Sequence, residues 1–213
     1  MIGMAESLRG ALMLARFDKR GLGAFDGSIA SARASFKVIW PLMIYYLIMS
    51  MGIFSLMSAT GMETAATEGS EGTIDDTAAL KAAALLAIGQ VISWLGLLVL
   101  MEAVLTRAEL GHRFHTALAA YNWTMFWRKA LELLPLLLVA GGAAAAGVGM
   151  LQLLILGYSL IYLFFTMKTA LDNHGFEAAL IVMLEVILAL TVPLLAAQTD
   201  PETFQALMNN AQR

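Results

Sequence analysis

One acidic residue, Glu185, lies inside a strongly apolar stretch and is the best candidate in the sequence for a chemical role. A carboxylate near the centre of a bilayer costs about 2.5–3.5 kcal/mol on insertion scales, so it must face other helices, take up a proton or pair with a polar group. Two interpretations follow. Glu185 is either a proton or cation site, or a structural acid that hydrogen-bonds to a neighbouring helix through Tyr158, Ser159 or Gln90.

A second polar group combines Glu109, His112 and His115 at i, i+3 and i+6, with His174 elsewhere in the chain. Metal binding requires these side chains to converge, but successive steps of three residues drift around a helix with 3.6 residues per turn. We therefore expect polar residues of a surface helix here and no metal site. The chain has no cysteine, which excludes disulfides and thiolate ligands. It also has no phosphate loop, nucleophile elbow or Ser/His/Asp set, which predicts a protein that is not an enzyme and needs no cofactor.

Composition indicates that the elements carrying these residues are membrane helices. Hydrophobic residues make up 60% of the 213 residues and charged residues 14%, against about 45–50% and about 25% in soluble proteins. A helix that crosses a membrane needs about 20 mostly apolar residues. Five segments meet or approach this length: 38–58, 82–105, 130–146, 149–167 and 177–197. The predicted fold class is an all-α, polytopic membrane helix bundle, and a net charge of −3 gives no indication of nucleic-acid binding.

The third and fourth segments form one nearly continuous apolar run. A single helix over about 37 residues would be about 55 Å long, whereas the hydrocarbon core of a bilayer is about 30 Å thick. We therefore expect a tight reversal, and glycine is the residue that best tolerates one. The glycines that bracket the expected turn are Gly141, Gly142, Gly147 and Gly149. The alternative is one long, tilted helix.

The basic residues indicate the orientation of the bundle. Of the 13 Lys and Arg residues, six precede the first span, four lie between the second and third, and one lies between the fourth and fifth. Loops rich in Lys and Arg stay in the cytoplasm, so this partition predicts five spans, a cytoplasmic N-terminus and an outer C-terminus. Residues 1–37 would form a cytoplasmic interfacial segment, 38–197 the membrane domain and 198–213 a short helix on the outer face.

Two amphipathic stretches on the cytoplasmic side predict further helices. Apolar residues recur at helical spacing in both: Met4, Leu8, Leu12 and Ala15, and then Phe114, Leu118, Tyr121 and Met125. Such helices lie along a membrane surface or pack against a protein, and the sequence leaves both possibilities open. Aromatic and basic residues around the second stripe are typical of a membrane interface: Trp123, Trp127, Arg128 and Lys129.

Small residues on segment 82–105 predict close packing between helices. Gly89, Ser93 and Gly96 are spaced i, i+4 and i+7, so they share one helix face. Small residues allow membrane helices to approach each other closely. We expect this face to pack against another helix of the bundle.

Three features carry a resemblance to a known family. They are Ala120-Tyr121-Asn122-Trp123 before the third span, the stretch from Tyr158 to Ala170 that ends the fourth, and Glu185 as the buried acid of the fifth. With this arrangement the chain resembles the YIP1-type five-span integral membrane proteins, in particular their uncharacterised bacterial relatives. The resemblance implies a topology of five spans with a cytoplasmic N-terminal segment, and it implies no chemistry.

These features favour a non-catalytic integral membrane protein that acts as a scaffold or accessory subunit of an inner-membrane assembly. Its expected partners are the lipid bilayer and either other membrane proteins or further copies of itself. The alternative is a small proton- or cation-coupled transporter that uses Glu185. Replacing Glu185 with glutamine distinguishes the two hypotheses, because only a transporter would lose pH-dependent flux while keeping its fold.

Overall fold

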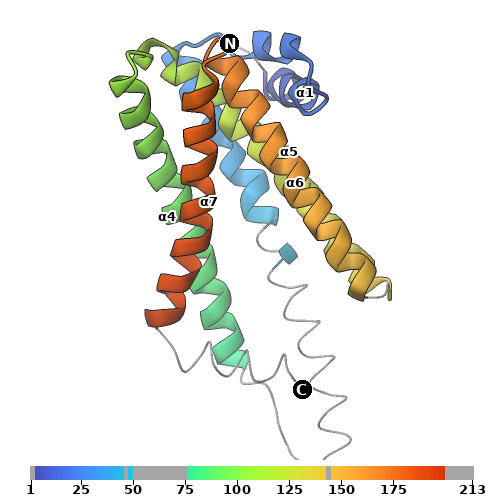
Figure 1. Ribbon diagram of the computed structural model, residues 1–213. Helices are drawn as coiled ribbons and strands as arrows, with labels where there is room; N and C mark the ends of the chain where they lie inside the picture. The colour runs from blue at the N-terminus through green and yellow to red at the C-terminus, as the bar shows by residue number, and fades with distance from the viewer. Residues whose placement is uncertain (1–2, 46–47, 50–75, 143–144, 200–213) are drawn as a thin grey trace, which may run out of the picture.

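The computed structural model describes residues 3–45, 48–49, 76–142 and 145–199, and every regular element in these ranges is helical (Figure 1). The elements are α1 (Met4–Ala15), η1 (Lys19–Ala24), α2 (Ile29–Ser35), η2 (Phe36–Val38), α4 (Asp76–Arg107), η3 (Gly111–Arg113), α5 (Phe114–Ala140), α6 (Ala145–Ala170) and α7 (Gly175–Thr199). Residues 39–45 continue as helix after η2. Most of the predicted first span beyond residue 45, and residues 200–213 of the predicted outer helix, lie outside the described residues.

Three of the long helices are apolar enough to cross a membrane. Within the described residues these stretches are Ala87–Arg107 of α4, Gly147–Ala170 of α6 and Gly175–Val192 of α7. They correspond to the predicted second, fourth and fifth spans. Large aliphatic side chains on their outer surfaces are exposed, for example Val99, Leu153 and Leu190. Since water would oppose such exposure, these surfaces are suited to contact with lipid or with other apolar helices.

The expected reversal between the third and fourth segments is present. Helix α5 ends at Ala140, and α6 begins at Ala145 and runs back along it. Gly142 has a φ of +82°, a conformation that glycine adopts at little cost. Gly147 and Gly149, which were also expected near the turn, lie inside α6 instead.

Helix α5 corrects the prediction of a separate surface helix before the third span. It runs without a break from Phe114 to Ala140 because no glycine or proline interrupts it before Pro135. Residues 117–125 are all buried, since α1 and α2 cover this half of the helix. The apolar stripe in this segment therefore packs against the protein's own N-terminal helices rather than along a membrane surface.

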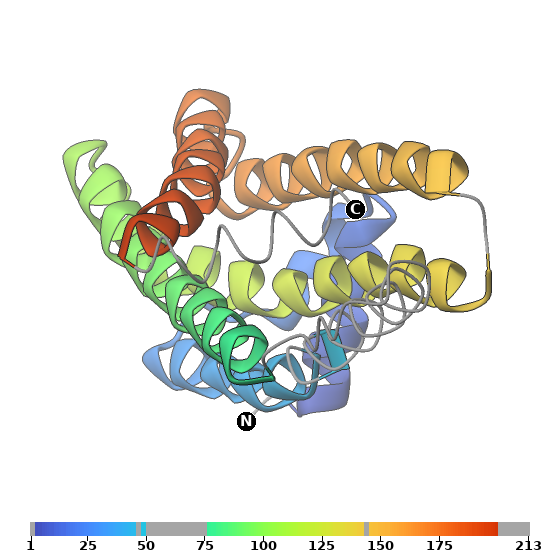
Figure 2. The same cartoon turned by 90° about the horizontal axis from the view of Figure 1, so that it is seen from below.

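The long helices form two pairs that meet along α6 and α7. Helix α4 packs against α7, α5 packs against α6, and α6 also contacts α7. Figure 2 shows α5 and α6 running side by side while α4 and α7 cross at an angle. We call the end of the bundle formed by α1, η1, η3 and the 171–174 loop the capped end (Figure 1). Two contacts join these parts: Arg113 to Asp172 at 3.0 Å, and Lys19 to Asn173 at 3.3 Å.

The capped end is held together by a close approach between α1 and η1. A Cβ atom at Gly21 would overlap the carbonyl oxygen of Gly10, and one at Gly10 would overlap the Cβ of Ala24. The backbones therefore touch where side chains would otherwise separate them. Arg20 donates hydrogen bonds to Asp18, and this lowers the pKa of that carboxyl. The N-terminal segment is thus a compact folded unit within the structure.

Candidate functional site

The candidate site is built around an ion pair between α5 and α7. Arg128 Nη1 lies 2.8 Å from Glu185 Oε1 and 3.2 Å from Glu185 Oε2. The two side chains are only 10% and 21% exposed. Glu185 was expected to bind a proton or cation, or to hydrogen-bond to Tyr158, Ser159 or Gln90. The structure pairs it with Arg128, which the sequence places at the membrane interface, and the proton or cation site stays a prediction.

Helix geometry explains why the two charges meet. Both α5 and α7 begin at the capped end. At 1.5 Å per residue, Arg128 lies about 21 Å along α5 and Glu185 about 15 Å along α7. Their long side chains span the remaining difference in depth. The sequence prediction missed this pair because it began the third span at residue 130, which left Arg128 at the surface.

Several further polar atoms on α5 and α6 are buried within the bundle. Among the residues that the structure describes, four such atoms have no hydrogen-bond partner: Thr124 Oγ1, Arg128 Nε, Ser159 Oγ and Thr166 Oγ1. Thr124 and Arg128 are one turn apart on α5, and Ser159 and Thr166 flank Tyr162 on one face of α6. Buried polar atoms are normally paired, so these four groups stand out in an otherwise apolar part of the bundle.

Three aromatic side chains connect the helices of the site to α1. Each donates a hydrogen bond to a backbone carbonyl: Trp127 to Leu8 at 3.0 Å, Tyr162 to Ala11 at 2.6 Å and Tyr158 to Ala15 at 2.5 Å. The three acceptors lie on one face of α1, where Ala11 and Leu14 are fully buried. Of the predicted apolar stripe, Leu8 and Ala15 pack against the core, whereas Met4 is 46% exposed. The buried face of α1 consists of Ser7, Gly10, Ala11 and Leu14, and α1 packs on α5 and α6, which is one of the two possibilities that the sequence leaves open.

Asn122 forms a second buried polar contact, at the centre of the Ala120–Trp123 segment. Its side chain accepts a hydrogen bond from Trp94 Nε1 at 3.1 Å and donates one to Ser35 Oγ at 2.8 Å. These residues come from α5, α4 and α2, and Asn122 is completely buried. Both hydrogen bonds of Asn122 join different helices, so its role is to fix the packing of three elements.

The expected interfacial residues occupy different environments. Trp123 is 3% exposed and belongs to the core. Trp127 is partly buried against the core cluster. Lys129 forms an ion pair with Glu132 at 2.7 Å, and Glu132 also accepts a hydrogen bond from Tyr45 at 2.9 Å. This part of α5 is thus a contact region between helices.

The small-residue face of α4 lies against α7. Ser93 Oγ is 3.5 Å from the carbonyl oxygen of Leu188. A Cβ atom at Gly89 would lie 3.0 Å from Val192 Cγ1, and one at Gly96 would lie 3.9 Å from Leu188 Cδ1. The small side chains at these positions allow the two helices to approach closely.

The Glu109, His112 and His115 group is divided among three parts of the chain. Glu109 precedes η3 with a φ of +60°, His112 lies in η3, and His115 lies in α5. The helical spacing assumed from the sequence therefore does not apply. Across the described residues, the structure gathers no three His, Cys, Asp or Glu side chains in a way that would hold a metal ion.

In the part of the chain that the structure describes, every regular element is helical and three helices are long and apolar enough to cross a membrane. Comparison of the chain with protein-family models, with curated proteins and with solved structures gives no match. The resemblance to YIP1-type proteins therefore stays a prediction, and the function must be argued from the geometry.

Proposed function

We propose that this chain is a non-catalytic membrane protein that serves as a scaffold or accessory subunit of a bacterial inner-membrane assembly. In this proposal five helices cross the membrane and the capped end faces the cytoplasm, as the distribution of Lys and Arg indicates. The observation that carries the proposal is the Arg128–Glu185 ion pair. Glu185, the acid that the sequence places inside an apolar segment, thus forms a contact between two helices.

A coupling carboxylate in a transporter must exchange its proton or cation during the transport cycle. The guanidinium of Arg128 lies within 2.8 Å of Glu185 and stays charged at any physiological pH. The carboxylate of Glu185 is thus already engaged by a fixed positive charge from another helix. The pair is therefore better suited to holding α7 against α5 than to carrying a proton.

One observation favours the alternative of a small proton- or cation-coupled transporter. Within the described part of the chain, Thr124, Arg128, Ser159 and Thr166 each have a buried polar atom without a partner. A polar strip inside an apolar bundle is a feature of solute and ion pathways. In that case Glu185 and these hydroxyl groups would together contact the transported species.

Gentle purification from native membranes, followed by identification of co-purifying proteins, tests the first proposal. We expect a membrane protein at a constant molar ratio to the chain. The Glu185→Gln variant should keep this partner or bind it somewhat less tightly. Glu102→Gln, at an exposed acid on α4, is the matched control and should leave the partner unchanged.

Flux measurements in proteoliposomes test the alternative. The scaffold proposal predicts no pH-dependent flux above that of empty liposomes for wild-type protein. It would be contradicted by a flux that Glu185→Gln abolishes and Glu102→Gln preserves, with each rate normalised to the amount of folded protein. A homo-oligomer without another subunit, combined with such a flux, would establish transport instead.

A further inference from the structure

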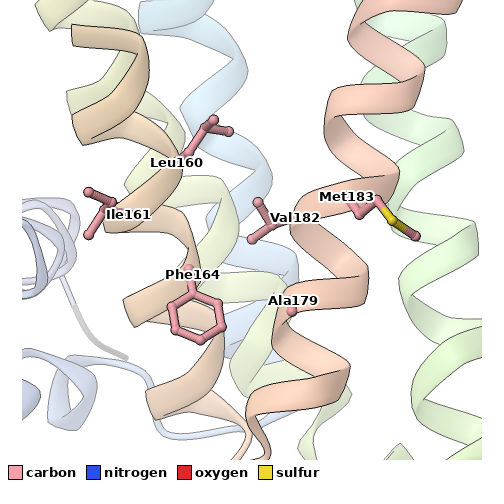
Figure 3. Close-up of a pocket in the computed structure, with 6 residues that line it drawn as sticks. All are labelled: Leu160, Ile161, Phe164, Ala179, Val182 and Met183. Atoms are coloured by element: carbon pink, nitrogen blue, oxygen red, sulfur yellow. The ribbon is translucent and has the colours of Figure 1, made fainter. Parts of the chain in front are cut away.

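The outer surface between α6 and α7 contains an open cleft (Figure 3). Its volume is about 340 Å³, and it is open along the outer surface of the two helices. Three apolar side chains from each helix line it: Leu160, Ile161, Phe164, Ala179, Val182 and Met183. Figure 3 shows the Val182 side chain pointing from α7 toward α6. Both helices include stretches apolar enough to cross a membrane, so a bound group must be apolar along this cleft.

A basic side chain lies just beyond the cleft on α6. Leu160, Phe164 and Lys168 are spaced i, i+4 and i+8, so they follow one face of the helix toward the capped end. Lys168 is in the last turn of α6, and within the described residues its side chain forms no ion pair or hydrogen bond.

The acids closest to Lys168 in the sequence have partners of their own. Asp172 lies 3.0 Å from Arg113, and Glu177 lies 3.7 Å from His174. The ammonium group of Lys168 is therefore available to an external anion. Because Lys168 and the apolar cleft share one helix face, the two features together match a molecule with a long apolar part and a negatively charged end.

We propose that the cleft binds one acyl chain of an anionic phospholipid and that Lys168 contacts the lipid phosphate. Lysine lays its aliphatic stem along apolar surfaces and keeps its ammonium group at the level of the headgroups. Basic side chains near the membrane surface also favour anionic over zwitterionic lipids. Arg16, the C-cap residue of α1, and Lys19, the first residue of η1, add positive charge at the capped end. This site is independent of the function proposed above, because a scaffold and a transporter would both accommodate it.

Native mass spectrometry of the full-length chain, mixed with equal amounts of phosphatidylglycerol and phosphatidylcholine of the same acyl composition, tests the site. We expect one phosphatidylglycerol to be retained in preference to phosphatidylcholine. Lys168→Gln should lower this preference about fivefold, the effect of one basic side chain beside an anionic lipid surface. Arg107→Gln removes an exposed charge from the end of α4 and should leave the preference unchanged.

A second pair of variants tests the cleft itself. Ala179→Leu adds volume inside the cleft and should remove retention of both lipids. Ala189→Leu makes the same change at an exposed position on α7 outside the cleft and should have no effect. Equal retention of the two lipids by wild-type protein would overturn the proposal, as would equal losses in the Lys168 and Arg107 variants. A lipid-free dimer that Ala179→Leu disrupts would identify a second copy as the occupant and would also overturn it.

Discussion

Arg128 and Glu185 are charges on separate helices that stabilise each other within an apolar bundle. Removing one partner of a buried ion pair leaves the other charge uncompensated, at a cost of about 3–5 kcal/mol. Both side chains retain some exposure, so we expect Arg128→Gln and Glu185→Gln each to lower the free energy of unfolding by about 3 kcal/mol. The double variant should lose less free energy of unfolding than the sum of the two single losses, because it leaves no unpaired charge. Unfolding of the two single variants and the double variant in detergent micelles measures these free energies.

The exposed pair between Arg113 and Asp172 provides the control for this cycle. It links η3 to the 171–174 loop at 3.0 Å, and the two side chains are 36% and 68% exposed. Such surface pairs contribute about 0–1 kcal/mol, so Arg113→Gln should have little effect. Additive losses in the Arg128 and Glu185 double variant would show that the two charges do not interact energetically.

The sequence predicts that Glu185 requires a partner, but it does not identify the partner. That requirement follows from the cost of a charge in an apolar segment, which depends on local composition alone. The choice of Arg128 depends on where α5 begins and on which helices pack together. Hydropathy begins the third span near residue 130, whereas the helix begins at Phe114, and α1 and α2 cover its first half.

The docking of helix α1 on η1 depends on two glycines, Gly10 and Gly21. A Cβ atom at Gly21 would overlap Gly10 O and lie 2.9 Å from Leu14 N. Gly21→Ala should therefore destabilise the contact between α1 and η1 by about 1–3 kcal/mol, the usual cost of overpacking. Hydrogen exchange of the α1 amides should accelerate accordingly. Gly23→Ala changes the same short element where a Cβ atom meets open space, and exchange as fast as in Gly21→Ala would contradict this explanation.

The hydrogen bond from Tyr162 to Ala11 provides an independent test of the same docking. Tyr162→Phe keeps the buried ring and removes the hydroxyl group, leaving the carbonyl of Ala11 without this donor. The expected cost is about 1 kcal/mol, seen as faster hydrogen exchange in α1 with little change in α7. Uniform acceleration across both helices would instead indicate a global loss of stability.

For whole elements, the sequence predicts which segments are helical better than it predicts what packs against each helix. The stripes of α1 and of the first half of α5 each indicate that one helix face is buried. A stripe does not show whether lipid or protein buries it, because both are apolar. The aromatic donors Trp127, Tyr158 and Tyr162 settle this for α1 in the structure, and they lie more than 100 positions away in the sequence.

At the scale of the whole molecule, the fold places the N-terminal elements and two loops at one end. Helices α4 to α7 alternate in direction, so η3 and the 171–174 loop lie at the capped end, while Gly141 and the start of α4 lie at the other (Figure 1). Eleven of the 13 basic residues precede the first predicted span or fall between predicted spans two and three or four and five. The helical class and the reversal after α5 were predictable from hydropathy and helix length, whereas the covering of α5 by the N-terminal elements was not.

This arrangement predicts which positions an impermeant thiol reagent reaches in intact cells. The chain has no cysteine, so single cysteines report their own positions without background. His112→Cys and Asn173→Cys, both exposed at the capped end, should react only after the cells are lysed, because the capped end faces the cytoplasm in our proposal. Lys81→Cys and Gly141→Cys, exposed at the opposite end, should react in intact cells. Labelling of His112→Cys and Lys81→Cys from the same side would mean that α4 does not cross the membrane, since these positions flank its apolar stretch.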